Sequence, residues 1–184
     1  MNTLIALAVA LLSATHVTAQ VAPRSADGLL RAVLKAVQDQ SLDAQSPSRS
    51  RQPMFRPGIA LVVDRDDFDR HVVKQGFVSD HRDATTALDG LVFRNRSWSK
   101  VRSCTPAAAS TPPRCTLPPG TVVVRVGTVV WSADRSDVTV QVGAYRRSEV
   151  SGGQPGIGGT VSTYTFRLRK GAWVLIRTGP TFTS

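Results

Sequence analysis

Regular alternation of valine in the last third of the chain constrains the fold more than any other feature. In Thr121–Trp131 and Asp137–Tyr145, valine recurs at every second position along much of each segment. A period of two is typical of a β-strand with one buried face. The polar stretch Ser132–Ser136 between the segments predicts a loop. We therefore expect two long antiparallel strands that cover a hydrophobic core.

The same pattern predicts how the two strands pair. When Val130 lies opposite Val138, the apolar residues of both strands share one face. That face contains Val124, Val126, Thr128, Val130, Val138, Val140, Val142 and Ala144. A shift of one residue would place the valines against polar positions, because side chains alternate between the two faces of a sheet.

A second hairpin is predicted at the C-terminal end. The strands Thr160–Arg169 and Ala172–Thr178 are joined by Lys170-Gly171, and we expect a two-residue turn there. This turn places an aromatic-rich set on one face, which we expect to pack against a helix. The set is Tyr164, Phe166, Leu168, Trp173 and Leu175. The glycine-rich stretch Gly152–Gly159 predicts a flexible connection between the two hairpins.

Helices are predicted in the first half of the chain. Ser25–Gln40 has one apolar face with helical spacing. That face contains Leu29, Leu30, Val33, Leu34 and Val37. Asp64–Gln75 predicts a second helix that Asp64 or Asp66 caps, with Gly76 at its end. Its inward side chains are expected to be Phe68, Val72 and Val73.

The remaining segments give weaker signals. Ile59–Val63 is either a strand or the entry to a helix, and Asp83–Phe93 is expected to add one or two helical turns. Ser46–Pro57 mixes Ser, Arg and Pro without periodicity, which is typical of a loop. Phe93–Ser103 is expected to be extended.

The last hairpin, Tyr164–Leu175 (YTFRLRKGAWVL), resembles the end of small NTF2-like domains, also called SnoaL-like or cystatin-like. The resemblance is carried mainly by residues 120–184. It implies an α+β fold, with N-terminal helices packed on a curved antiparallel β-sheet meander that forms a cone around a pocket. The family includes isomerases, cyclases and ligand carriers. None of its catalytic residues matches here, so the resemblance implies a shape rather than a reaction.

The first 19 residues predict export. Met1–Ala19 has no charged side chain, Leu4–Ser13 is a short apolar run, and Val17–Ala19 offers small residues to a signal peptidase. We expect cleavage after Ala19 and a secreted or periplasmic protein. Residues 20–57 then supply the N-terminal helix and its loop. Residues 58–184 supply the rest of a single domain.

The two cysteines are expected to form a disulfide. Cys104 and Cys115 are the chain's only cysteines, and an exported protein meets an oxidising compartment. The residues between them are Pro, Ala, Ser and Thr with one Arg, so this loop has no core-forming side chains.

A positive net charge indicates anionic partners. The formal net charge is +10 at pH 7, and such a field attracts anions. In Phe93–Arg102, cations surround Trp98. We assign a candidate anion-binding surface, here called the basic segment, to Arg94, Arg96, Lys100 and Arg102. The alternative is an ordinary solvated edge strand with Trp98 packed inward. Export disfavours nucleic acid as the partner.

Other candidate chemistry has simpler explanations. Asp64–Asp69 is rich in carboxylates, but it lacks the Gly and Glu that an EF-hand loop needs. We expect these acids to cap a helix and to lie near arginines. His71 and His81, with Asp69 and Asp80, match no zinc spacing. No cofactor or metal motif is present, and no segment after the leader is long and apolar enough to span a membrane.

These observations favour a non-enzymatic ligand-binding or envelope-interaction module. Its expected partners are anionic envelope components or a small apolar ligand. The alternative is a small NTF2-like enzyme of the isomerase, dehydratase or cyclase type, acting on an apolar ligand in the cone. An enzyme should place a polar or titratable group in an apolar pocket. A binding module should instead present a basic or apolar outer patch.

Overall fold

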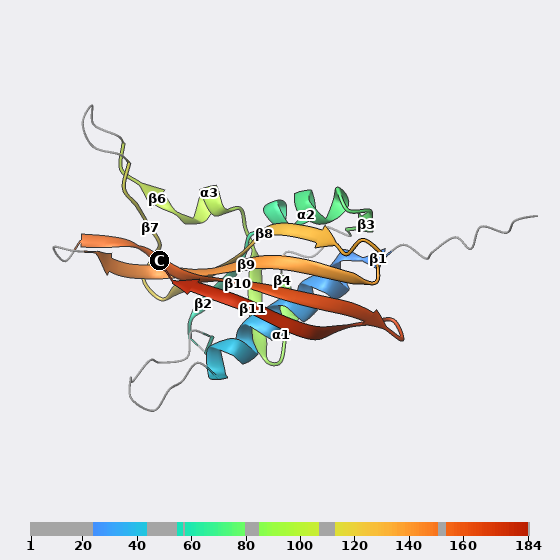
Figure 1. The fold of residues 1–184 in the computed structure, drawn as a ribbon. Coiled ribbons are helices and arrows are strands. Elements are labelled where there is room, and N and C mark those ends of the chain that lie inside the picture. Colours follow the sequence, from blue (N-terminus) through green and yellow to red (C-terminus); the bar gives the residue numbers. More distant parts are fainter. Residues whose placement is uncertain are drawn as a thin grey trace, which may run out of the picture.

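The computed structural model describes residues 24–43, 55–56, 58–79, 85–106, 113–150 and 154–183. The predicted leader Met1–Ala19, most of the predicted loop Ser46–Pro57, and His81 lie outside the described residues. The described part is α+β, as predicted, with helices on a large sheet (Figure 1).

A seven-stranded sheet dominates the fold. Its strands in spatial order are β11 (Ala172–Thr183), β10 (Gln154–Arg169), β9 (Asp137–Val150), β8 (Thr121–Trp131), β2 (Ala60–Val63), β5 (Leu91–Asn95) and β4 (Thr85–Leu88). Strands β8 to β11 form the antiparallel meander that the valine pattern predicts. The predicted antiparallel sheet is only partly correct, because the sheet is mixed: β2 is parallel to both β5 and β8. Parallel neighbours need a crossover connection, and α2 (Arg65–Val73) lies on the path from β2 to β5.

Helix α1 (Ala26–Asp43) covers the inner face of the sheet, where it contacts β11, β9 and β4 (Figure 1). Its predicted apolar face is confirmed, and the five side chains of that face are buried. They share one core with Phe68, Phe93 and the inward valines of β8 and β9. Burial of this amphipathic face supplies most of the stability of such a helix.

Helix α2 follows β2 directly and contacts β8. Asp64 is its N-cap, and the Asp64 carboxylate accepts a hydrogen bond from the backbone N–H of Asp67 (3.4 Å). Phe68 and Val72 are buried as predicted, but Val73 is exposed. Along β8, β2 pairs only with Thr121–Val124. Helix α2 contacts the part of β8 that β2 leaves without a neighbouring strand.

A β-bulge changes the predicted pairing of β8 with β9. Val126 lies opposite Val142 and Val124 opposite Ala144, as predicted, but the register shifts between Val126 and Thr128. The extra residue reverses the faces beyond it. Val130 therefore points outward and is 56% exposed, while its neighbour Val129 is buried. The predicted pair Val130–Val138 is wrong, and the loop Ser132–Ser136 is confirmed.

The C-terminal hairpin has the predicted register, with Leu168 opposite Trp173 and Phe166 opposite Leu175. Tyr164 and Phe166 are buried, but Leu168 and Leu175 are 38% and 40% exposed. The prediction that all five side chains line the core is therefore only partly correct. The physical reason is that Leu175 lies on the edge strand β11 and Leu168 lies beyond the last residue of β10 that pairs with β9, so each has a neighbouring strand on one side only.

The glycine-rich connection is also different from the prediction. Strand β10 begins at Gln154, and Gly156, Gly158 and Gly159 pair with β9. The Tyr145 ring explains one of these glycines: a Cβ on Gly159 would lie 2.8 Å from Tyr145 Cδ1. The stretch is therefore a strand, and glycine at position 159 leaves space for the neighbouring Tyr145 ring.

The predicted helical turns in Asp83–Phe93 are wrong, because β4 and β5 form a hairpin there. Asp89 and Gly90 have φ values of 46° and 80°. Both lie in the left-handed region that a type I′ turn requires. The Asp-Gly pair is a strong hairpin signal, so the sequence did indicate the β4–β5 hairpin.

Five short elements complete the fold: helix α3 (Trp98–Val101) and the strands β1 (Arg24–Ser25), β3 (Phe77–Val78), β6 (Ser103–Cys104) and β7 (Cys115–Thr116). β1 pairs in parallel with β3, and β6 pairs with β7. The predicted disulfide is confirmed: Cys104 and Cys115 are bonded, with their Cα atoms 4.0 Å apart. None of the helices in the described part of the chain is both long and apolar enough to cross a membrane.

Candidate anion-binding surface and the adjoining groove

The basic segment lies on the outer face of the sheet, opposite α1. Strand β5 ends at Asn95, and helix α3 (Trp98–Val101) then covers this face. Val101 packs there in a second small core with Val62, Leu117 and Val123. The prediction of an extended edge strand over 93–103 is wrong, because α3 interrupts it and β4 lies outside β5.

All four cations of the basic segment are exposed. They are Arg94, Arg96, Lys100 and Arg102. Within the part of the chain that the structure describes, no carboxylate forms an ion pair with any of them. Arg94 lies beside Val62 in the sheet register, on the same outer face. The segment therefore presents four charges to solvent from one continuous piece of chain.

Trp98 lies between these cations in the sequence and is half-buried. The Arg102 guanidinium is 5.8 Å from its ring centroid, and that of Arg125 is 4.9 Å away. The ring also packs against Tyr145, with centroids 5.5 Å apart. Cations over an indole ring are attracted by its quadrupole. Arg125 comes from β8 and Tyr145 from β9, so sequence proximity alone could not reveal them.

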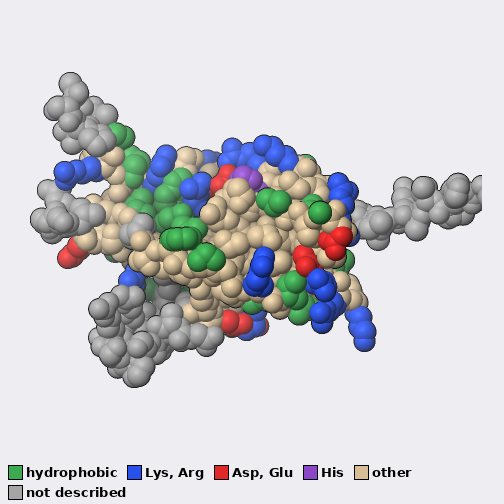
Figure 2. Space-filling model, in the orientation of Figure 1, with side chains coloured by type: hydrophobic (Ala, Val, Ile, Leu, Met, Phe, Trp, Pro, Cys, Tyr) green, Lys and Arg blue, Asp and Glu red, His purple; other side chains and the backbone are tan. Residues whose placement is uncertain are grey.

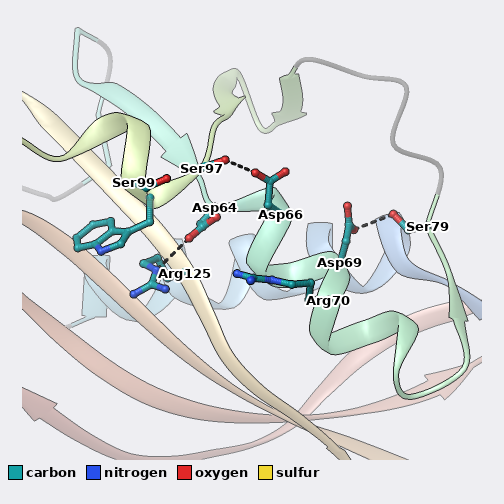
Figure 3. A pocket seen from close by; sticks show the side chains of 9 residues that line it. Asp64, Asp66, Asp69, Arg70, Ser79, Ser97, Ser99 and Arg125 are labelled. Atoms are coloured by element: carbon teal, nitrogen blue, oxygen red, sulfur yellow. Dashed lines mark hydrogen bonds and ion pairs between the residues drawn. The ribbon is translucent and has the colours of Figure 1, made fainter.

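A groove of about 630 Å³ adjoins the basic segment. Its walls come from α2, the start of α3 and β8 (Figure 3). The lining residues are Asp64, Asp66, Asp69, Arg70, Ser79, Ser97, Trp98, Ser99 and Arg125. Trp98 lines the groove and contacts Arg102 of the basic segment, so the two features adjoin each other.

Two acids of the groove, Asp64 and Asp69, pair with arginines, as predicted. Arg125 Nε donates to Asp64 Oδ2 (3.1 Å), and its Nη2 donates to Asp67 Oδ2 (2.9 Å). Ser97 Oγ donates to Asp66, and the two side chains point toward each other in Figure 3. Together these contacts tie α2 to β8 and to the start of α3.

Arg65 holds a second, more deeply buried part of this network. The residue is only 4% exposed. Its Nε donates to Asp69 Oδ1 (2.9 Å), and its Nη2 lies 2.5 Å from Asp27 Oδ1 in α1. Ser79 accepts from Arg65 (3.1 Å) and donates to Asp69 (2.7 Å). This network positions α2 against α1.

The predicted histidine site is only partly described. His71 Nε2 lies 3.9 Å from Asp67 Oδ1 and is half-buried, while His81 and Asp80 lie outside the described residues. The described ranges contain no group of three or more His, Cys, Asp or Glu side chains placed to hold a metal ion. The arrangement can therefore offer charge and an aromatic surface to a ligand.

Comparison with protein-family models, curated proteins and solved structures found no match to this chain.

Proposed function

We propose that this protein is an exported, non-enzymatic binding module that recognises an anionic component of the cell envelope. One observation carries the proposal: four exposed cations, which no described carboxylate neutralises, lie within nine residues of chain on both sides of Trp98, and the Arg102 guanidinium is 5.8 Å from its ring centroid. The ligand chemistry that fits is a row of closely spaced phosphate or carboxylate groups, as on lipid headgroups or an acidic polysaccharide.

Electrostatic screening explains why this segment matters more than the total charge of +10. The Debye length at physiological ionic strength is about 8 Å. Only clustered charges act together under these conditions, and the four cations occur within nine residues from Arg94 to Arg102. Of the nearby acids, Asp64 and Asp67 already pair with Arg125, whereas Asp66 accepts a hydrogen bond from Ser97.

Packing of the interior supports a binding module over an enzyme with an NTF2-like pocket. Such a pocket would open between the helix and the sheet. Leu30, Val33 and Leu34 of α1 and Phe166 of β10 are all 0% exposed in one core. A water-sized cavity would expose the side chains that line it. The Tyr164 hydroxyl, a polar group in this core, donates to Gln40.

The disulfide supports export. Stable disulfides persist in the periplasm and outside cells and are rare in reducing compartments. Cys104 and Cys115 are bonded in a part of the fold with little hydrophobic core of its own. Export to the envelope would bring the basic segment to the anionic surfaces named above.

The test is binding of the mature protein to anionic vesicles and to an acidic polysaccharide over a range of salt concentrations. One variant changes all four cations of the basic segment to Gln. A matched control removes the same charge from exposed positions elsewhere: Lys74, Arg135, Arg169 and Lys170. We expect the first variant to lose binding to at least one ligand, with a shallower salt dependence, and the control to retain it. Equal losses would show that net charge alone explains binding.

A further inference from the structure

An apolar strip borders the basic segment on the outer face of the sheet. The strip consists of Trp98, Tyr145, Ile157, Val161 and Phe182. Trp98 packs on Tyr145, and a Cβ on Gly143 would lie 2.4 Å from Tyr145 Cε2. The Tyr145 ring therefore covers Gly143. Val161 pairs with Gly143 on one side and with Phe182 on the other.

The register places this strip beside the cations. Arg125 pairs with Gly143, so Arg125, Gly143, Val161 and Phe182 form one row across four strands. Strands in a sheet are about 4.8 Å apart, so Phe182 lies roughly 15 Å from Arg125. Arg147 pairs with Ile157 and is exposed at the far side of the strip. The apolar side chains thus lie between cations.

Exposure increases along the strip toward the edge of the sheet. Trp98, Tyr145, Ile157 and Val161 are half-buried, whereas Phe182 on the edge strand β11 is 64% exposed. Figure 2 shows hydrophobic side chains gathered near the C-terminal end of β11, with Lys and Arg side chains around them. Contiguous exposed apolar side chains mark interaction sites, whereas apolar side chains that are exposed singly are ordinary. Phe182 continues an apolar strip and so belongs to the first kind.

We infer that the apolar strip and the basic segment together form a peripheral membrane-binding face for bilayers that contain anionic lipids. This inference rests on the proposed function and names its ligand. The cations bind headgroup phosphates, while Phe182 enters the boundary between headgroups and acyl chains. Trp98 and Tyr145 have the amphipathic rings that suit this boundary.

Charge complementarity and the apolar side chains together select a lipid surface. Each basic side chain near an anionic bilayer contributes about 1 kcal/mol, and buried apolar area adds a term that salt does not screen. A polysaccharide would neutralise the cations but would leave Phe182 in water. A lipid surface satisfies both parts of the face at once.

The test uses the mature protein and sedimentation with vesicles of phosphatidylcholine alone or mixed with phosphatidylglycerol. The key variant is Phe182→Ser, with every cation retained. The matched control is Val130→Ser, because Val130 is also exposed and outward-facing but lies away from the strip. In salt high enough to screen the cations, we expect Phe182→Ser to weaken partitioning into mixed vesicles by about tenfold or more. Val130→Ser should behave like the parent.

A second measurement reports depth of insertion directly. A Phe182→Trp variant should lose fluorescence when the vesicles contain acyl-brominated lipid, beyond any loss in the parent protein. Thermal melting of each variant checks that it remains folded. We expect all of them to fold, because Phe182 and Val130 are both exposed.

The outcomes separate this inference from the proposed function. Vesicle binding that depends on the basic segment but not on Phe182 would overturn the inference and leave the proposed function intact. Binding to an acidic polysaccharide but not to vesicles would do the same. Failure to bind either ligand would overturn both.

Discussion

At the scale of single residues, Gly28 shows how closely α1 meets the C-terminal hairpin. A Cβ at this position would lie 3.6 Å from Trp173 Cδ1, which is an ordinary van der Waals contact. Glycine within a helix costs about 0.5–1 kcal/mol relative to alanine. We therefore expect Gly28→Ala to raise the free energy of unfolding by about that amount, measured by urea denaturation. A loss of stability would show that Trp173 packs more tightly on α1 than this distance indicates.

Trp173 itself belongs to an aromatic cluster at one end of the core. Its ring centroid lies 5.8 Å from that of Phe77 and 5.9 Å from that of Trp131. Replacing a fully buried large aromatic by alanine costs about 3–5 kcal/mol. Because Trp173 is half-buried, we expect Trp173→Ala to lose about 2–3 kcal/mol. A variant that melts like the parent would contradict this packing.

Arg65 and Arg70 give a matched comparison of buried and exposed ion pairs within one helix. The Arg65 side chain is 5% exposed and pairs with Asp27 and Asp69, whereas that of Arg70 is 70% exposed and pairs with Asp67. Removing one partner of a buried pair strands the other charge and costs about 3–5 kcal/mol. We expect Arg65→Ala to lose that much, and Arg70→Ala to lose less than about 1 kcal/mol. Similar losses in urea denaturation would mean that the Arg65 network contributes little.

These residues also show what the sequence could reveal about the site. The prediction that the acids of Asp64–Asp69 cap a helix and lie near arginines followed from local spacing, and it is confirmed. Arg125 could not be assigned as their partner, because 61 positions separate it from Asp64. Only the parallel pairing of β2 with β8 brings the two together.

At the scale of elements, the β8–β9 loop depends on one carboxylate. Asp134 accepts hydrogen bonds from Ser132 Oγ (2.6 Å), Ser136 N (3.1 Å) and Ser136 Oγ (3.0 Å). The bond from the Ser132 side chain, followed by those from Ser136, lowers the pKa of Asp134 to about 2. At pH values above the ordinary Asp pKa near 3.8, these hydrogen bonds therefore stabilise the folded loop. Protonation of Asp134 removes this stabilisation as the pH falls toward 2.

An NMR titration of the Asp134 side-chain carboxyl checks this expectation. We expect a midpoint near pH 2, well below that of an unstructured aspartate. Changing Ser132 and Ser136 to Ala removes the side-chain donors and should move the midpoint upward. A midpoint near 3.8 in the parent protein would show that these hydrogen bonds are not formed in solution.

The disulfide hairpin is the second element with a measurable role. In Figure 1, β6 and β7 project away from the main sheet. Closing a loop of this length stabilises by about 3 kcal/mol on the chain-entropy model. We expect Cys104→Ser with Cys115→Ser to lose at most that amount. Hydrogen exchange should accelerate at the Thr105 amide, which donates to Arg114 O, while amides of the β8–β9 pair stay protected. Uniform acceleration would mean that the hairpin is part of the main cooperative unit.

Element predictions failed where a single extra residue or a neighbouring ring decided the structure. The period-two valines predicted β8 and β9 but could not reveal the bulge at Gly127, because Val129 and Val130 are adjacent and either of them could face the core. The glycine-rich sequence of 152–159 is typical of a loop, and the sequence could not reveal that Gly159 lies against the Tyr145 ring within a strand. The β4–β5 hairpin, by contrast, had an Asp-Gly signal that the apolar spacing of Asp83–Phe93 obscured.

At the scale of the whole molecule, the antiparallel half of the sheet was predictable and the rest was not. Hairpins join strands that are close in sequence, so β8 to β11 follow from local alternation and turn signals. β2 is only four residues long and gains its place through long-range parallel pairing. Four residues carry too little pattern to predict such a partner. The filled core likewise depends on how α1 lies on the sheet.

The positive charge of the molecule has a consequence for stability as well as for binding. Like charges repel in the folded state, so a cluster of unpaired cations should destabilise the protein. We expect the variant with Gln at Arg94, Arg96, Lys100 and Arg102 to be more stable than the parent at low ionic strength. The gain should be about 0.5–1 kcal/mol, since these charges are exposed.

Urea denaturation at low and at high salt checks this expectation. The difference between variant and parent should shrink at high salt, because screening weakens repulsion between exposed charges. A gain of this kind would mean that the four cations lower the stability of the folded protein, which fits a role in ligand binding better than a structural role. If the variant is instead less stable at both salt concentrations, the contact of Arg102 with Trp98 outweighs the repulsion. The basic segment would then also stabilise the fold, and the vesicle and polysaccharide measurements would decide whether it binds a ligand.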